Sequence, residues 1–186
     1  MKKLLILLIA LILVLFIVKD YKSGSSKSVE TPVPSASPSI QRNETRSLEG
    51  DKKLIMTTKQ NADGKIQYTF LIPNSGNELV IFTKVADRGE TINLPQNSWS
   101  PSSKYVFLED RRGSMVDYLV FKTNGEPFAD GQKYLNATAL FNAKVKDYNL
   151  KAITGWDDPV LMHVLTFNGP PFWFDLTTQS FIQLVR

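Results

Sequence analysis

From residue 53 onward, the sequence alternates apolar and polar residues over short stretches, and turn-forming residues interrupt the alternation about every eight to twelve positions. A period of two places successive side chains on opposite faces of a strand, whereas a surface helix needs a period near 3.6. β-Branched and aromatic residues are frequent in the same stretches, and no convincing helical period is found. The pattern predicts an all-β domain over residues 51–186.

Turn signals divide this region into separate strands. Asn61–Gly64 ends in Asp-Gly, which supplies the positive φ that a tight hairpin turn requires. Pro73–Asn77 and Asp87–Gly89 provide the next two reversals. The predicted strands are Lys53–Lys59, Lys65–Ile72, Glu78–Ala86, Tyr105–Glu109, Met115–Thr123, Leu135–Phe141, Val160–Thr166, Phe172–Thr177 and Phe181–Val185.

One unit of sequence occurs twice in the domain. Trp99 is followed by a polar turn with proline, an apolar strand, a second turn and a second strand, and the same order follows Trp156, 57 residues later. Recurrence of such a unit at about 40 to 60 residues is typical of blade-like sheets stacked on one another. We therefore expect a stack of short antiparallel sheets.

The stretch Trp-Ser-Pro-Ser-Ser-Lys at residues 99–104 resembles the Trp-Ser-Pro-Asp-Gly-Lys signature of β-propeller repeats in the periplasmic propeller protein of the Tol-Pal system and in prolyl-oligopeptidase-type propellers. Asp-Leu-Thr-Thr at residues 175–178 resembles a later element of the same repeats, and Trp-Asp-Asp-Pro at residues 156–159 resembles a degenerate copy of the first. Residues 53–86 would supply one further, weaker unit. The resemblance implies a propeller-like fold and a role in protein interaction.

The length of the domain limits the number of blades. About 135 residues at about 45 per blade make three blades, whereas closed propellers usually need at least four. The domain is then an open stack of sheets, or it completes itself by pairing with another chain; a sandwich or meander follows if the repeated unit is coincidental. An incomplete propeller exposes edge strands that favour association, so a homo-oligomer is expected.

Leu4–Val18 is an uninterrupted apolar run of 15 residues, with Lys2 and Lys3 before it and Lys19 after it. As a helix it would span roughly 22 Å, less than the ~30 Å hydrocarbon core of a bilayer. The lysines can extend to the headgroups, so we expect an uncleaved transmembrane anchor; the alternative is a cleaved signal peptide. No Ala-x-Ala site follows the run, which favours the anchor. The lipid bilayer is thus an expected partner through residues 4–18.

The lysine pair at the start of the chain favours a cytoplasmic tip of residues 1–3 and an extracytoplasmic domain, in the periplasm or at the cell surface. Residues 19–50 are rich in Ser, Gly and Pro. Such a composition cannot bury enough apolar area to offset its ordering entropy. These residues are therefore predicted to form a disordered tether between the anchor and the domain.

The charge of the domain excludes one class of partner. Of the formal net charge of +4, most resides in residues 1–49, which hold 7 Lys/Arg and 4 Asp/Glu, against 15 and 14 in residues 50–186. A near-neutral domain lacks the basic surface that nucleic-acid binding requires, so nucleic acid is not an expected partner. The chain contains no cysteine, which excludes disulfides, thiolate nucleophiles and zinc-thiolate sites.

Few residues suit catalysis or cofactor binding. His163 is the single histidine and lies inside an apolar predicted strand, where a packed or surface role is expected. Asp157, Asp158 and Asp175 do not form the spaced loop that calcium requires, and the first two are expected to cap a turn. We therefore predict a non-enzymatic protein with no catalytic residues, no metal and no cofactor.

Two groups of residues are candidates for a binding surface. Arg111 and Arg112 are predicted at a hairpin tip, where they could meet an anionic headgroup or a protein partner. Phe172, Trp173 and Phe174 form an aromatic cluster of a kind that anchors proteins and sugars. Alternation places Trp173 on the opposite face of its strand from the two phenylalanines, so one of the two sets belongs to the core.

These features predict a membrane-anchored, extracytoplasmic, propeller-like binding or scaffold module that contacts a protein of the cell envelope, whose identity the sequence does not specify. Trp99 and Trp156 are expected in the core. Two alternatives are an accessory propeller domain of a peptidase or hydrolase system and a carbohydrate-binding β domain that uses the Trp173 face.

Overall fold

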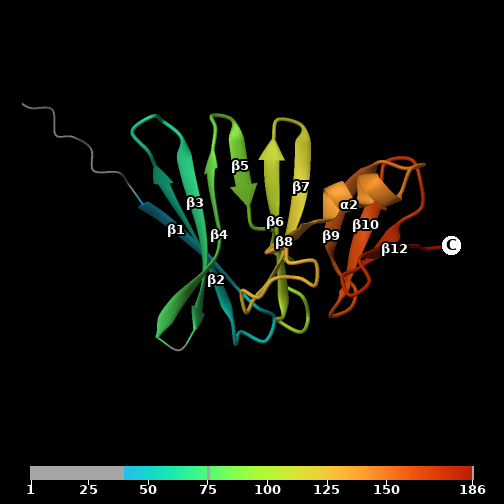
Figure 1. Ribbon diagram of the computed structural model, residues 1–186, viewed down its shortest axis with the longest axis horizontal. Coiled ribbons are helices and arrows are strands. Elements are labelled where there is room, and N and C mark those ends of the chain that lie inside the picture. The colour runs from blue at the N-terminus through green and yellow to red at the C-terminus, as the bar shows by residue number, and fades with distance from the viewer. Residues whose placement is uncertain (1–39, 75, 186) are drawn as a thin grey trace, which may run out of the picture. The chain divides into compact units, whose positions relative to one another are not determined.

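The computed structural model describes residues 40–74 and 76–185, which form a mostly β structure with one short helix. The strands in these residues make three four-stranded antiparallel sheets, here named A, B and C in chain order. Figure 1 shows the three sheets side by side. Each sheet is a meander of four consecutive strands, so its two edges are its first and its last strand.

The bounds of the elements are as follows. Sheet A contains β1 (Ile40–Arg46), β2 (Lys53–Gln60), β3 (Ile66–Asn74) and β4 (Asn77–Ala86); sheet B contains β5 (Glu90–Asn93), β6 (Tyr105–Arg112), β7 (Met115–Lys122) and β8 (Tyr134–Asn136); sheet C contains β9 (Leu150–Trp156), β10 (Leu161–Thr166), β11 (Phe172–Asp175) and β12 (Ser180–Gln183). The helix α2 (Ala137–Lys144) follows β8 directly.

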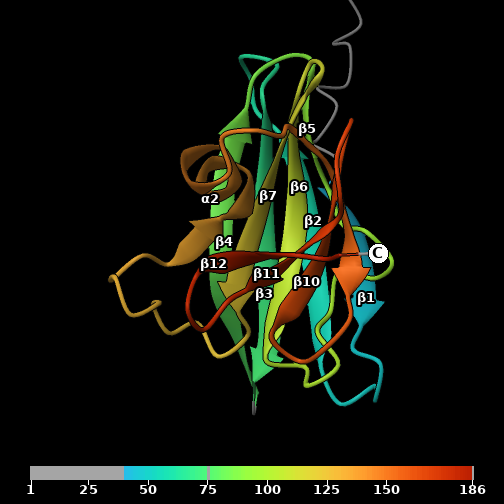
Figure 2. The ribbon, with the colours of Figure 1, turned by 90° about the vertical axis from the view of Figure 1, so that its right-hand side faces the viewer.

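Sheet B lies between the other two sheets and is buried on both faces. Val106 of β6 belongs to the core that sheet B shares with Phe70 of sheet A, whereas Phe107 belongs to the core shared with Phe174 of sheet C. All four side chains have no exposed surface. Alternate side chains of one strand point to opposite faces, so one strand serves two cores. The three sheets therefore stack as blade-like units, and Figure 2 shows α2 beside the stack.

The two tryptophans of the repeated sequence unit lie at the two successive interfaces between sheets. Trp99 is buried in the core between sheets A and B, as predicted. Trp156 packs against the core between sheets B and C and is half-buried, which differs from the predicted core position. Its indole N–H donates a hydrogen bond of 3.0 Å to the carbonyl oxygen of Ser98 and thereby ties sheet C to the turn beside Trp99.

Most of the predicted strands are present with shifted ends, and the predicted turn at Asn61–Gly64 joins β2 to β3. The prediction was wrong for Leu135–Phe141, because β8 ends at Asn136 and α2 begins at Ala137. The Asn136 side chain accepts a hydrogen bond of 2.9 Å from the backbone N–H of Ala139 and caps the helix. The sequence pattern also missed β5 and β9.

Strand β1 lies inside the segment that was predicted to be a disordered tether, so the ordered structure begins before residue 50. It pairs with β2 in continuous antiparallel register, from Ile40 opposite Lys59 to Arg46 opposite Lys53. Almost all of its side chains are exposed and most are polar. An exposed edge strand needs no apolar alternation, which is why the pattern did not predict it.

The predicted membrane anchor at residues 4–18 and residues 19–39 of the predicted tether lie outside the described residues. Among the residues that the structure describes, no helix is both long and apolar enough to cross a membrane.

Candidate functional site

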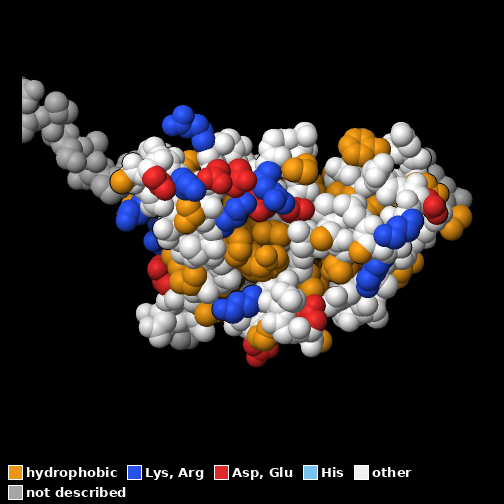
Figure 3. Space-filling view, turned by 45° about the horizontal axis from the view of Figure 1, so that its top comes forward, with side chains coloured by type: hydrophobic (Ala, Val, Ile, Leu, Met, Phe, Trp, Pro, Cys, Tyr) orange, Lys and Arg blue, Asp and Glu red, His pale blue; other side chains and the backbone are white. Residues whose placement is uncertain are grey.

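A groove lies between β4, at one edge of sheet A, and β8, at one edge of sheet B. Two cavities of about 340 and 320 Å³ have Phe82, Thr83 and Tyr134 in common among their lining residues. Figure 3 shows hydrophobic side chains gathered on this side of the molecule, with a band of charged side chains above them. The groove thus combines an apolar surface with a charged rim.

The rings of Phe82 and Tyr134 line the groove and pack on the buried ring of Phe121. The ring centroid of Phe82 lies 5.1 Å from that of Phe121 and 5.8 Å from that of Tyr134, and the last two are 5.5 Å apart. Phe121 is buried, but Tyr134 is 37% exposed and Val80 in the wall of the groove is 55% exposed. Apolar side chains exposed together in a concave surface are typical of a site that a ligand or partner covers.

Strand β4 exposes backbone groups as well as side chains. It is ten residues long and pairs only with β3, so the N–H and C=O groups of its other edge have no strand partner among the described residues. In sheet B, β8 pairs with β7 only from Leu119 to Phe121, and the Thr138 side chain covers the next part of β7: it accepts from the backbone N–H of Tyr118 and donates to the carbonyl of Val116, each at 3.1 Å. An open edge of this length can accept an additional strand.

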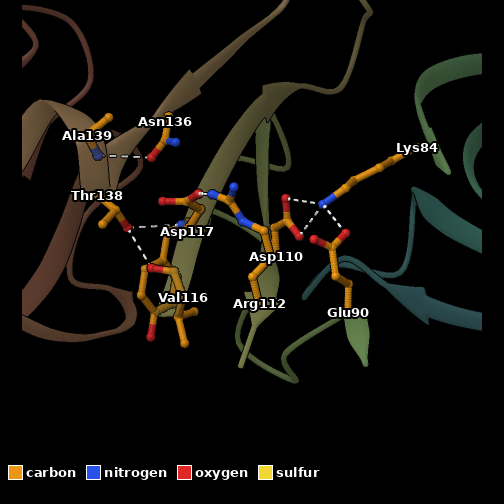
Figure 4. Close-up of polar contacts among 10 residues, drawn as sticks. Lys84, Glu90, Asp110, Arg112, Val116, Asp117, Asn136, Thr138 and Ala139 are labelled. Carbon is orange, nitrogen blue, oxygen red and sulfur yellow. Dashed lines mark hydrogen bonds and ion pairs between the residues drawn. The ribbon is translucent and has the colours of Figure 1, made fainter. Parts of the chain in front are cut away.

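A partly buried ion pair forms one part of the charged rim, and Figure 4 shows its residues. The Lys84 ammonium group lies 2.7 and 2.8 Å from the two carboxylate oxygens of Asp110 and 3.4 Å from Glu90. Burial alone lowers the pKa of Lys84, but the hydrogen bond and charge of Asp110, with the charge of Glu90, outweigh burial and leave this pKa above its ordinary value. The pair therefore joins β4 of sheet A to β6 of sheet B in its charged form.

Arg111 and Arg112 lie at the end of β6, next to the β6–β7 turn, as predicted. Arg111 binds the Glu109 carboxylate through two nitrogens, at 2.6 and 2.9 Å, and Arg112 is paired with Asp117. Arg112 lines the groove, whereas Arg111 does not. Each arginine is already matched by a carboxylate, so this rim carries little net charge for an anionic partner.

The aromatic cluster in β11 is divided between two faces of sheet C, as the alternation predicted. Phe172 and Phe174 are buried in the core shared with sheet B. Trp173 lies on the other face, directly opposite His163 of β10 and Ile182 of β12, and Ile182 is 46% exposed. This row, here named the terminal face, places the apolar side chains of Trp173 and Ile182 beside His163 on the last sheet of the stack.

Polar contacts account for the acidic and histidine side chains on this part of the chain. Asp158 accepts from the backbone N–H of Val160 at 3.4 Å, as expected for a residue that caps a turn. The Asp157 carboxylate instead accepts from the indole N–H of Trp173 on β11 at 2.7 Å, which differs from the expected turn cap. The His163 ring nitrogen Nδ1 lies 2.8 Å from the Thr154 hydroxyl. Within the described ranges, no group of three or more His, Asp or Glu side chains could hold a metal ion.

Asp175 ends β11 in a turn that its own side chain stabilises. Its carboxylate accepts from the backbone N–H of Thr177 at 2.8 Å and from the hydroxyls of Thr177 and Thr178 at 2.6 and 2.9 Å. Burial raises the pKa of Asp175, but these hydrogen bonds outweigh it and hold the pKa below its ordinary value. The Asp-Leu-Thr-Thr element is therefore a strand-ending turn rather than a ligand site.

The sequence analysis missed the groove residues Phe82, Tyr134 and the Lys84–Asp110 pair. Phe82 was placed on a strand, but alternation cannot tell which neighbouring sheet a side chain faces. Tyr134 immediately precedes the predicted strand Leu135–Phe141, and most of that predicted strand is helical in the structure. The sequence held no signal that marked these residues, because Val80 and Phe82 are ordinary apolar positions of the third predicted strand.

Comparison of the chain with models of protein families, with curated proteins and with solved structures finds no match. The structure itself defines the class: a mostly β domain built from three four-stranded antiparallel sheets that stack as blade-like units, with a groove between two neighbouring sheets.

Proposed function

We propose that this chain is a non-catalytic protein-binding module with an incomplete, propeller-like stack of blades, displayed outside the cytoplasm by an anchor at residues 4–18. The blade-like packing and the Trp-Ser-Pro-Ser-Ser-Lys stretch at residues 99–104 support the propeller-like description. The apolar run flanked by lysines supports the anchor and an extracytoplasmic location. An extracytoplasmic domain would meet proteins of the cell envelope, so the binding partner is expected among them.

The observation that carries the proposal is the groove beside the open edge of β4. An extended polypeptide would add a strand to β4, and backbone hydrogen bonds would supply affinity. Its alternate side chains would cover Val80, Phe82 and Tyr134, which gives a preference for apolar residues at every second position. The partner is therefore a protein segment in extended conformation.

The test is selection of peptides on the whole 186-residue chain from a display library of random linear peptides. We expect the enriched peptides to have apolar residues at every second position. Val80→Glu and Tyr134→Ala should each weaken their binding about tenfold or more, because a charge or a cavity then replaces the apolar contact. Affinities are measured by fluorescence anisotropy of labelled peptides.

The matched control is Met115→Glu, because Met115 is an equally accessible apolar residue that lies outside the groove. Peptides that lose affinity for Met115→Glu as much as for Val80→Glu would show that binding occurs elsewhere, and the groove would be rejected as the site.

The terminal face of sheet C supports a second proposal, that two copies of the chain associate there. In a longer stack of blades a further sheet would cover Trp173, His163 and Ile182, and here a second copy takes that place. The exposed side chain of Ile182 and the half-buried ring of Trp173 supply the apolar contact.

Light scattering on residues 38–186, the compact unit that contains every described strand, should give the mass of a dimer. Ile182→Glu should shift the mass to that of a monomer, since it places a charge in the apolar contact. Met115→Glu, which is remote from the terminal face, should leave the dimer intact. A monomer for the unaltered unit at high protein concentration would exclude this association.

A further inference from the structure

A further cavity, of about 350 Å³, lies at the other end of sheets A and B from the charged rim. Three segments far apart in the chain form it: the residue before β2, the residue before β6, and the end of β7 with the turn that follows it. Its lining includes the side chains of Lys52, Lys104, Lys122, Thr123, Asn124 and Glu126. Three of these six residues are cationic.

Neutral oxygen atoms hold the Lys52 ammonium group in place. It donates to the carbonyl oxygen of Ser103 and to the hydroxyl oxygen of Thr123, each at 3.0 Å. Thr123 is buried and donates its own proton to the same carbonyl at 2.8 Å. Lys52 therefore has a fixed position. The neighbouring Asp51 carboxylate, which accepts a hydrogen bond of 2.6 Å from the Ser47 hydroxyl, interacts with the charge of Lys52 but lies beyond ion-pair distance of it.

Lys122 is held in the same way. Its ammonium group donates to the carbonyl oxygen of Pro127 at 2.8 Å and lies 5.3 Å from the centre of the Phe128 ring, over which a cation is attracted. Lys104 is exposed. In the part of the chain that the structure describes, none of the three lysines lies within ion-pair distance of a carboxylate.

The contrast with the opposite end of the sheets is the central observation. At the charged rim, Lys84, Arg111 and Arg112 are each matched by a carboxylate. Around the cavity, three lysines face one acidic residue, Glu126, so the lining carries a net charge of +2 (three minus one). Clustered ammonium groups repel one another, and this repulsion is relieved when an anion binds between them.

We propose that this cavity binds a phosphate group in its doubly charged, monoester or inorganic form. Such a group carries about −1.5 to −2 charges at neutral pH and three strong acceptor oxygens, which suits a lining of net charge +2. Lysine ammonium groups bind phosphate as point charges, and the side-chain amide N–H groups of Asn124 add a polar donor. The phosphate could belong to a soluble molecule or to a lipid headgroup; the chemistry at the cavity is the same.

The experiment is a titration of the whole chain, purified in detergent at low ionic strength, with inorganic phosphate, followed by isothermal calorimetry. We expect saturable binding with one site. Lys104→Gln should weaken binding about fivefold, and Lys104→Gln with Lys122→Gln about tenfold or more, because each removes a charge that contacts the anion. Added salt should weaken binding as well.

The matched control is Lys59→Gln with Lys151→Gln, two exposed strand lysines outside the cavity, which changes the net charge of the chain by the same amount. It should bind phosphate like the unaltered chain. Lys104→Arg retains the charge and should retain binding, which separates loss of the site from loss of folding. No saturable binding, or equal loss in the control double variant, would overturn the proposal.

A second titration separates the two sources of phosphate. Water-soluble dibutyryl phosphatidic acid presents the same monoester on a lipid headgroup. Tighter binding of this compound than of inorganic phosphate, with the same dependence on Lys104, assigns the site to a lipid headgroup; equal or weaker binding assigns it to a soluble phosphate. Because this site shares no residue with the groove beside β4, its failure leaves the proposed peptide-binding function unaffected.

Discussion

Phe107→Ala should lower the free energy of unfolding of the domain by about 3–5 kcal/mol, the largest effect of any substitution considered for this chain. Phe107 has no exposed surface and lies on the face of sheet B that packs against sheet C. Its ring centroid is 6.1 Å from that of Tyr118 and 6.3 Å from that of Trp156. Removing the ring leaves a cavity between two sheets that have no disulfide to hold them together.

Chemical denaturation, followed by tryptophan fluorescence, measures this change. Met115→Ala is the matched control, because Met115 is an exposed apolar residue on β7 and its removal should change the free energy of unfolding by less than about 0.5 kcal/mol. If both substitutions had the same small effect, the close packing of sheets B and C would be refuted.

Lys84→Met should destabilise the domain by about 2 kcal/mol, a value between those of exposed and of fully buried ion pairs. Lys84 is paired with both oxygens of Asp110, whose side chain is only 10% exposed. Removing the lysine leaves a nearly buried carboxylate without its partner. Replacing both residues, as Lys84→Met with Asp110→Leu, should restore most of the loss, because neither charge is then buried.

The exposed pair of Arg111 and Glu109 is the control, and Arg111→Met should cost less than about 1 kcal/mol. The effect of Lys84→Met should also depend on pH. Because the folded state raises the pKa of Lys84, the stabilisation is complete below the ordinary lysine pKa of 10.5 and is lost as the pH rises through the higher folded value. A difference between the two proteins that persists unchanged at strongly alkaline pH would contradict this assignment.

Local patterns predicted those parts of the fold whose cause is local. Alternation identified β6 and β7, and Asp-Gly identified the β2–β3 turn, because face alternation and positive φ are properties of adjacent residues. The strand β1 escaped prediction because an exposed edge strand buries nothing that could impose a pattern. The helix α2 escaped because eight residues give too little helical period to detect, although its cap Asn136 was visible in the sequence.

The candidate sites were harder to predict because they depend on which sheets become neighbours. Phe172, Trp173 and Phe174 could be divided between two faces from alternation alone, and the structure confirms that division. The groove needs Phe82 and Tyr134 to meet from different sheets, and the lysine cavity needs three strand ends to meet at one end of two sheets. The spacing of residues in the sequence does not predict either of these contacts between sheets.

The meander order within every sheet bears on how the chain acquires its structure. Each described strand pairs only with the strand before or after it, so every pairing joins segments that are close in the sequence. Contacts of small sequence separation keep loop-closure entropy low, which is the condition for fast folding even in all-β proteins. Each sheet can therefore form as soon as its four strands have left the ribosome. Its apolar face is then available for the next sheet to pack against.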